Sequence, residues 1–278
     1  MVNDWVEVAE RCYVRRYPEW DLSVTVVAGQ ESSLVVDSRA THALGAALRT
    51  DIERLGVPPL AHVVNTHAHF DHSWGNQAFA DLPVWAAEGV RACWDEHVAR
   101  IRSQISAAPD DDPTGELLTT DLRQPDRSVA SVAAIDLGDR YVELVAPGRG
   151  HTAGDLVVVI PDAGLLCAGD LVEQSGPLSY GEDCWPLEWP QTLELLIGLM
   201  NDDAVVVPGH GSVVDKAFVL NQRLDAADIA GQIDQLVTAG VPADEALASG
   251  SWPYDAALLD HAVRRGRTHL LVRAAARP

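Results

Sequence analysis

The sequence Thr66-His67-Ala68-His69-Phe70-Asp71-His72 directly follows the apolar run Ala61-His62-Val63-Val64-Asn65. A run with β-branched residues that closes on histidine and aspartate predicts a strand that delivers polar side chains into a loop at a sheet edge. Proteins commonly place binding and catalytic residues in loops of this kind. The stretch therefore predicts a strand and a functional site beside it.

Four side chains of the stretch are of types that bind zinc, iron or manganese. In an extended segment, residues two apart point the same way, so His67 and His69 can grip one ion. The bend that follows can turn Asp71 and His72 toward a second ion. The alternative is a polar turn with incidental histidines, and three later segments argue against it.

Each of those segments places a metal-ligand type just after a predicted strand and beside glycine. They are Gly150-His151-Thr152, Gly169-Asp170 and Pro208-Gly209-His210-Gly211. Glycine suits tight turns in which the backbone lies close to an ion. The candidate ligands are therefore His67, His69, Asp71, His72, His151, Asp170 and His210. The other histidines are interpreted as surface or satisfied core side chains, namely His42, His62, His97, His261 and His269.

The rest of the chain predicts alternating strands and helices. Apolar residues at helical spacing predict a helix over 42–55 that stops at Gly56. The segment 103–127 is rich in Pro, Asp, Thr and Ser, and is either a solvated excursion or a flap over the site; we interpret it as the excursion. From Lys216 onward an apolar stripe predicts helix up to Gly240, with further helical patterns over 244–248 and 255–263.

Composition sets limits on the class of protein. The chain has 278 residues, of which 47% are hydrophobic and 22% charged, so it can bury a large core. Its net charge of −21 disfavours nucleic acid and anionic membranes as partners. The expected partner is a small-molecule substrate, and a homodimer stays open. One dense basic cluster, Arg264-Arg265-Gly266-Arg267, is interpreted as a solvated helix end.

Two further features bear on the compartment. The four cysteines, Cys12, Cys93, Cys167 and Cys184, are scattered without a Cys-x-x-Cys pair and are interpreted as reduced thiols. The chain shows neither a signal-peptide pattern at its N-terminus nor an apolar run of bilayer length. We therefore expect a soluble, cytoplasmic protein.

The set of motifs, taken in this order, resembles the metallo-β-lactamase superfamily. The resemblance is carried by Asp37, the 67–72 stretch, and the three glycine-flanked segments, and it covers residues 5–214. It implies an α/β (α+β) fold, a four-layer αβ/βα sandwich of two mixed β-sheets with helices outside. We expect a catalytic domain over 1–214 and a C-terminal helical extension over 215–278 packed on it.

The resemblance also implies a role for each candidate residue. It assigns His67, His69 and His151 to a first metal. It assigns Asp71, His72 and His210 to a second. Asp170 would bridge the two metals, and Asp37 looks like the structural aspartate of the family beneath the site.

Two divalent cations that share one water lower its pKa from about 15.7 to near neutrality, which makes hydroxide available as a nucleophile. The resulting hypothesis is a dinuclear hydrolase with two Zn²⁺ per chain, or Fe or Mn in their place. It would cleave a small ester, thioester, lactone or amide by attack of a metal-bridging hydroxide. Asp71 is the candidate group for handling the released proton.

Differences between this sequence and particular members of the superfamily narrow the predicted activity. Asp170 separates the chain from the β-lactamases proper and makes it similar to hydrolases of the glyoxalase II and lactonase kind. Tyr180 follows Asp170 at a distance along the chain similar to that of a substrate-holding tyrosine in glyoxalase II. The resemblance therefore implies that Tyr180 is a catalytic hydrogen-bond donor or acid. The alternative is a loop tyrosine without function. Trp74 and Trp185 either wall an apolar pocket or pack the core.

Three alternatives remain at this stage. One is an iron-dependent persulfide dioxygenase-like redox enzyme on the same fold, because imidazole and carboxylate also suit iron. Another is a β-lactam hydrolase. The third is a non-catalytic, metal-stabilised binding module, which is disfavoured because structural zinc is normally closed by four tight ligands.

Overall fold

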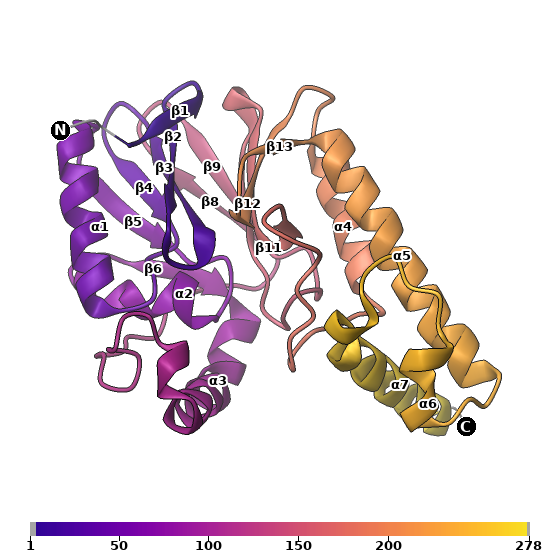
Figure 1. Cartoon of the computed structure of the whole chain (residues 1–278). Helices are drawn as coiled ribbons and strands as arrows, with labels where there is room; N and C mark the ends of the chain where they lie inside the picture. Colours follow the sequence, from indigo (N-terminus) through magenta and orange to yellow (C-terminus); the bar gives the residue numbers. More distant parts are fainter. Residues whose placement is uncertain (1–3, 277–278) are drawn as a thin grey trace.

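The computed structural model describes residues 4–276, and its strands form two layers that face each other (Figure 1). The first layer has the strand order β1-β2-β3-β4-β5-β6-β7 and is mixed, since β4 to β7 are parallel and β1 to β4 antiparallel. The bounds of its strands are β1 (Val6–Ala9), β2 (Cys12–Tyr17), β3 (Leu22–Ala28), β4 (Ser33–Val36), β5 (Leu60–Val64), β6 (Val84–Ala87) and β7 (Arg127–Val129).

The second layer has the order β8-β9-β10-β11-β12-β13 and is also mixed, because β11 and β12 are parallel and the other pairs antiparallel. Its strands are β8 (Val132–Asp136), β9 (Tyr141–Val145), β10 (Val157–Ile160), β11 (Leu165–Glu173), β12 (Val205–His210) and β13 (Val214–Asp215). Within residues 4–276, one register pair, Leu22 with His210, joins the layers. The strands thus count formally as one 13-stranded sheet that folds over at this point.

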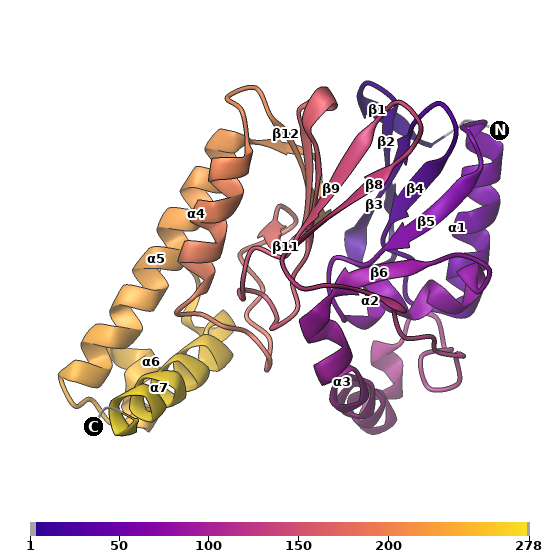
Figure 2. The same ribbon diagram turned by 180° about the vertical axis from the view of Figure 1, so that it is seen from behind.

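Helices cover the outer faces of both layers. Helix α1 lies outside the first layer, and α4 and α5 lie outside the second, as the opposite views in Figures 1 and 2 agree. The helices are α1 (His42–Leu55), α2 (Phe70–Ser73), α3 (Glu88–Ala107), α4 (Trp189–Leu199), α5 (Lys216–Thr238), α6 (Ala243–Ser249) and α7 (Asp260–Ala275). Short 3₁₀ helices are η1 (Glu19–Asp21), η2 (Trp74–Phe79), η3 (Pro109–Asp111), η4 (Pro161–Ala163) and η5 (Ala256–Leu258). The arrangement confirms the expected four-layer sandwich.

The main core lies between the two layers. Val27 and Leu34 from the first layer and Leu144 and Val158 from the second belong to one apolar cluster, and each is fully buried. Burial of such a side chain stabilises the fold by about 1.5–3 kcal/mol. Strands β3 and β4 are buried along their whole length because helices or the other layer cover both faces.

Helix α1 matches the prediction at both ends. Its N-cap Thr41 accepts the backbone N–H of Leu44 through its hydroxyl, and Gly56 ends it with φ of 76°, a left-handed conformation that glycine adopts without strain. The chain then enters β5, which delivers the histidine stretch.

Two predictions about irregular segments need correction. Most of the 103–127 segment is exposed, as an excursion would be, but α3 continues through its first part and Leu117, only 1% exposed, packs in a cluster with Trp94 and Ile105. The helix expected over 255–263 is instead α7, which begins at Asp260 and runs through the basic cluster. Arg264 to Arg267 therefore lie inside a helix rather than at its solvated end.

The C-terminal helices pack closely on the second layer. Ile229 of α5 and Val263 of α7 share an apolar cluster with Leu193 of α4. The division of the chain at residue 214 stays a prediction. No helix in the described part of the chain is both long and apolar enough to cross a membrane.

Candidate metal centre

The structure brings all seven candidate ligands together at one end of the two layers. His67 and His69 lie in the loop after β5, and Asp71 and His72 lie in α2. The remaining three come from the second layer: His151 follows β9, Asp170 lies in β11 and His210 ends β12.

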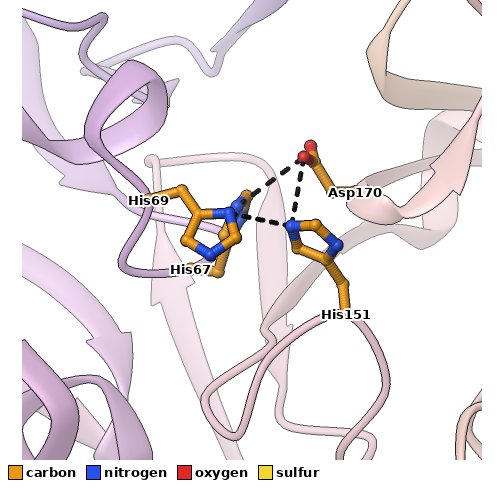
Figure 3. A group of neighbouring side chains, drawn as sticks. All are labelled: His67, His69, His151 and Asp170. Carbon is orange, nitrogen blue, oxygen red and sulfur yellow. Dashed lines mark hydrogen bonds and ion pairs between the residues drawn. The ribbon is translucent and has the colours of Figure 1, made fainter. Parts of the chain in front are cut away.

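The first group contains His67, His69, His151 and Asp170, whose side chains converge in Figure 3. Their potential ligand atoms all lie within 4.8 Å of one another. His151 Nε2 is 2.9 Å from His69 Nδ1 and 3.3 Å from Asp170 Oδ2. Asp170 Oδ2 is also 3.8 Å from His67 Nε2.

The second group contains Asp71, His72 and His210, with ligand atoms again within 4.8 Å of one another. The Nε2 atoms of His72 and His210 are 3.3 Å apart. Asp170 contacts this group too, since its Oδ1 is 3.1 Å from His72 Nε2 and its Oδ2 is 3.2 Å from His210 Nε2. The Asp170 carboxylate thus lies between the two groups.

Glycines allow this close approach, as the sequence suggested. A Cβ atom added to Gly209 would overlap the carboxylate of Asp170, and one added to Gly169 would meet Thr66 at 2.6 Å. Gly169 also has φ of 54°, which other residues adopt rarely. Gly169 therefore lets β11 approach Thr66 of the first layer, and Gly209 leaves room beside it in β12 for the Asp170 carboxylate.

The second group is oriented by acceptors in the first layer. Asp37, which directly follows β4, faces His72 Nδ1 at 2.8 Å and accepts the backbone N–H of Thr66. The carbonyl of Trp20 lies 2.7 Å from His210 Nδ1. A carbonyl can only accept, so His210 carries its proton on Nδ1 and its Nε2 lone pair faces the centre.

The histidines of the first group are likewise oriented by hydrogen-bond acceptors outside the centre. Ser179 O accepts from His151 Nδ1 at 3.0 Å, and Asp183 Oδ2 accepts from His69 Nε2 at 3.1 Å. The Thr66 hydroxyl donates to Asp37, which leaves its oxygen to accept from His67 Nδ1 at 3.0 Å. Each imidazole therefore turns its N–H outward and its lone pair inward.

Inward lone pairs at such short separations repel unless a cation lies between them. The buried Nε2 of His67 has no hydrogen-bond partner in the described structure. Burial lowers the pKa of His151 to about 4, so this imidazole is neutral, as a metal ligand must be. Burial lowers the pKa of His210, but the carboxylates of Asp170 and Asp71 outweigh it and raise this pKa to about 10, so the position attracts a positive charge, which a metal ion on Nε2 can supply in place of a proton. The donor set fits metal ions.

Two residues beside the first group had no signal in the sequence. His97, interpreted above as incidental, stacks on His69 with ring centroids 4.9 Å apart and is only 4% exposed. Arg100 donates both to His97 Nδ1 and to Asp183 Oδ2. Burial raises the pKa of Asp183, but its contacts with His69 and Arg100 outweigh burial and hold this pKa well below its usual range.

Tyr180 packs among apolar side chains and, within residues 4–276, makes no hydrogen bond to the ligand atoms. It packs on Trp189 with ring centroids 4.8 Å apart, in the apolar cluster outside the second layer, and its buried hydroxyl has no partner in the described structure. Burial, with Tyr254 and Cys184 nearby, raises its pKa well above the usual value. This position does not support the predicted catalytic role.

The tryptophans divide between packing and lining. Trp74 and Trp189 are fully buried and pack the core. Trp185 is half-buried and lines a cavity of about 160 Å³ together with Arg265. That cavity adjoins a second one of about 260 Å³ beside His69. The residues common to both cavities are His97, Arg100, Glu182 and Asp183.

The chain belongs to the metallo-beta-lactamase superfamily, whose family model matches residues 18–234. A metallo-beta-lactamase type 2 of Bacillus sp. (strain 170) is 27% identical over 191 residues, which cover 68% of this chain and 66% of that relative. The acyl-coenzyme A thioesterase MBLAC2 of Gallus gallus is 24% identical over 200 residues, covering 68% of this chain and 72% of that protein.

Solved structures share the fold. The sec-alkylsulfatase Pisa1 from Pseudomonas sp. superposes with a TM-score of 0.76 at 16% identity, covering 94% of this chain and 50% of that one. A metallo-beta-lactamase from Pontibacter korlensis superposes with a TM-score of 0.61 at 21% identity, covering 81% of this chain and 98% of that one.

Proposed function

We propose that the protein is a dinuclear zinc-dependent hydrolase that cleaves a small ester, thioester, lactone or amide. The observation that carries the proposal is the inward convergence of imidazole lone pairs around one carboxylate, Asp170. His67, His69 and His151 would hold the first ion, and a second set would hold the other. That second set is Asp71, His72 and His210, with Asp170 shared.

When bound, such ions supply Lewis-acid stabilisation of a developing oxyanion and lower the pKa of water. The protein's own part is to fix the ligands and to accept a proton. Asp71 Oδ2 lies 3.4 Å from His210 Nε2 and 3.5 Å from His72 Nε2, at the centre of the second group. Under this proposal, Asp71 would take the proton released as water attacks the substrate.

The cavities beside His69 support a small acyl substrate. His69 lines the larger one, so a scissile carbonyl bound there lies next to the first group. The names of the relatives point to acyl transfer as well, one to a thioester and another to a β-lactam amide. The sequence identities with these relatives are low and the match covers 66% of the first relative, so the substrate has to be identified by experiment.

The test combines elemental analysis with turnover. Protein purified without added metal is expected to contain about two zinc ions per chain and to hydrolyse a member of a panel of activated esters, thioesters, lactones and β-lactams. A metal-loaded preparation that is inert across the panel would contradict the proposal.

The rival function is an iron-dependent persulfide dioxygenase-like enzyme. A single ion would leave the second donor group, Asp71 with His72 and His210, without a role. The same elemental analysis separates the two functions, because one iron and no zinc would favour the dioxygenase.

A further inference from the structure

An arginine-rich cluster surrounds Trp185 in the loop between β11 and α4. The guanidinium carbon of Arg149 lies 3.6 Å from the centre of the indole ring, and that of Arg265 lies 5.7 Å from it. His269 of α7 stacks on the ring, with centroids 4.5 Å apart at 19°. Arg273 joins the cluster because Glu188 accepts from both Arg149 and Arg273. We call Arg149, Arg265 and Arg273 the arginine cluster.

The cluster carries excess positive charge in a chain whose net charge is −21. Glu188 is paired with Arg149 and Arg273, whereas Arg265 makes no ion pair within residues 4–276. The Nε–H of Arg265 donates to the carbonyl of Cys184, which fixes the guanidinium and leaves its other N–H groups free. The imidazole of His269 adds no charge, because burial and the nearby Arg265 lower its pKa.

The cluster lies beside the candidate metal centre. Of its three arginines, Arg265 lines the smaller cavity together with Trp185, and this cavity adjoins the one beside His69. The smaller cavity is also lined by Glu96, Glu182 and Asp183, so the excess positive charge lies at the cluster and not inside the cavity. Arg149 precedes His151 by two residues and Trp185 follows Asp183 by two, so each backbone lies within about 7–8 Å of a residue at the site. Figure 1 shows α3 and α7 at the same end of the molecule, on either side of the loop after β11.

Close packing of α7 holds the cluster in place. A Cβ on Gly266 would lie 2.9 Å from Ile233 Cγ2 of α5, so glycine permits the contact between these helices. Arg265 and His269 therefore stand on a rigid helix, which reduces the entropy cost of binding a ligand there.

We propose that the arginine cluster is a subsite for a phosphate group carried by the substrate, at a distance from the bond that is cleaved. The guanidinium of Arg265 has a pair of terminal N–H groups to offer an anion, and Arg149 and Arg273, which share Glu188, add positive charge beside it. Arg149 and His269 lie against the indole of Trp185, so charge rather than stacking is what the subsite offers. The position of the cleaved bond rests on the proposed function; the anion subsite itself does not.

Calorimetric binding of unreactive thioethers tests the subsite independently of turnover. S-methyl coenzyme A carries phosphates, S-methyl pantetheine lacks them, and S-methyl glutathione carries carboxylates. The native protein is expected to bind the first at least about tenfold more tightly than the other two, as the loss of charge-assisted hydrogen bonds implies. Arg265→Met should remove about tenfold of this preference, whereas the binding of S-methyl pantetheine stays unchanged.

Arg264→Met is the matched control, because Arg264 lies next to Arg265 but is 75% exposed and pairs with Asp260. It should leave all three affinities unchanged.

If Arg265→Met does not fold, a second variant replaces it. Arg273→Met, whose arginine is 55% exposed, should weaken the binding of S-methyl coenzyme A by about threefold. Equal binding of the first two thioethers, tighter binding of S-methyl glutathione, or unchanged affinity in a folded Arg265 variant would overturn the proposal. If the protein showed the expected affinities but no turnover of any substrate, the proposed function would be wrong and the anion subsite would still stand.

Discussion

The two donor groups differ in what holds them. In the second group, His72 of α2 is oriented by Asp37, which directly follows β4, and both side chains are almost fully buried. In the first group, His69 is oriented by Asp183, whose side chain is 29% exposed and which lies 114 residues further along the chain. The support of His72 is thus embedded in the first layer, while that of His69 is a residue in a loop of the second layer.

The difference has a functional meaning under the proposed function. Asp183 and Arg100, which orient His69, also line the cavities where substrate would bind. An orienting carboxylate in contact with solvent can be replaced in part by water, whereas a buried one cannot. Metal affinity in the first group is therefore expected to respond to the state of the cavity, and affinity in the second group to be fixed by the fold.

The largest expected effect is that of Asp170, the carboxylate shared by both groups. Asp170→Ala should lower the metal content from about two ions toward one per chain and reduce kcat by at least 10²-fold, on the order of 2.7 kcal/mol. Elemental analysis and steady-state kinetics measure both. Asp202→Ala, at a 99% exposed side chain, is the control. Two retained metals with near-normal turnover would show that Asp170 is no bridge.

The next effect concerns Asp37, which contacts His72 of the second group directly and reaches His67 of the first group only through the Thr66 hydroxyl. Asp37→Asn turns an acceptor into a donor opposite His72 Nδ1, so the second ion should bind about 10–100-fold more weakly. The variant should also be less stable by about 1–3 kcal/mol, because the buried backbone N–H of Thr66 competes for the remaining acceptor. Metal titration and thermal unfolding test this, with Asp203→Asn at an exposed position as the control. Unchanged affinity would mean that the fold orients His72 without Asp37.

A smaller effect is expected for the first group. Asp183→Asn should weaken the first ion by about tenfold, at the lower limit for such orienting partners, since water can reach His69 Nε2. Arg100→Met, which leaves Asp183 in place, should weaken it less. Competition with a chromogenic chelator gives both affinities. Should Asp183→Asn cost as much affinity as Asp37→Asn, the contrast between an exposed and a buried support would be wrong.

The smallest expected effect is at Tyr180. Tyr180→Phe should change kcat by less than about twofold and leave stability equal or higher by up to about 1 kcal/mol, because it removes a buried hydroxyl that has no partner in the described structure. Kinetics and thermal unfolding provide the measurement. A tenfold loss of kcat with unchanged stability would restore the catalytic role that the sequence suggested.

The sequence by itself determined the elements and the converging residues. Alternating strands, the capped helix over 42–55 and the glycine-flanked histidines depend on short-range spacing, which is visible in one dimension. The seven residues that meet in the structure were all predicted, because the sequence places each of them at or shortly after the end of a predicted strand, and strand ends of a sandwich meet at one edge. The roles of these residues at bound metals stay predictions.

Only the tertiary structure decided what orients and surrounds those residues. Asp183 reaches His69 across 114 residues, and the carbonyl of Trp20 reaches His210 across 190, contacts that no local pattern encodes. Arg265 was interpreted as part of a solvated helix end, yet α7 continues past it and packs it against Trp185. The physical reason is common to all three: a side chain's neighbours are set by how whole elements pack, while spacing along the chain fixes only which face of its own element it occupies.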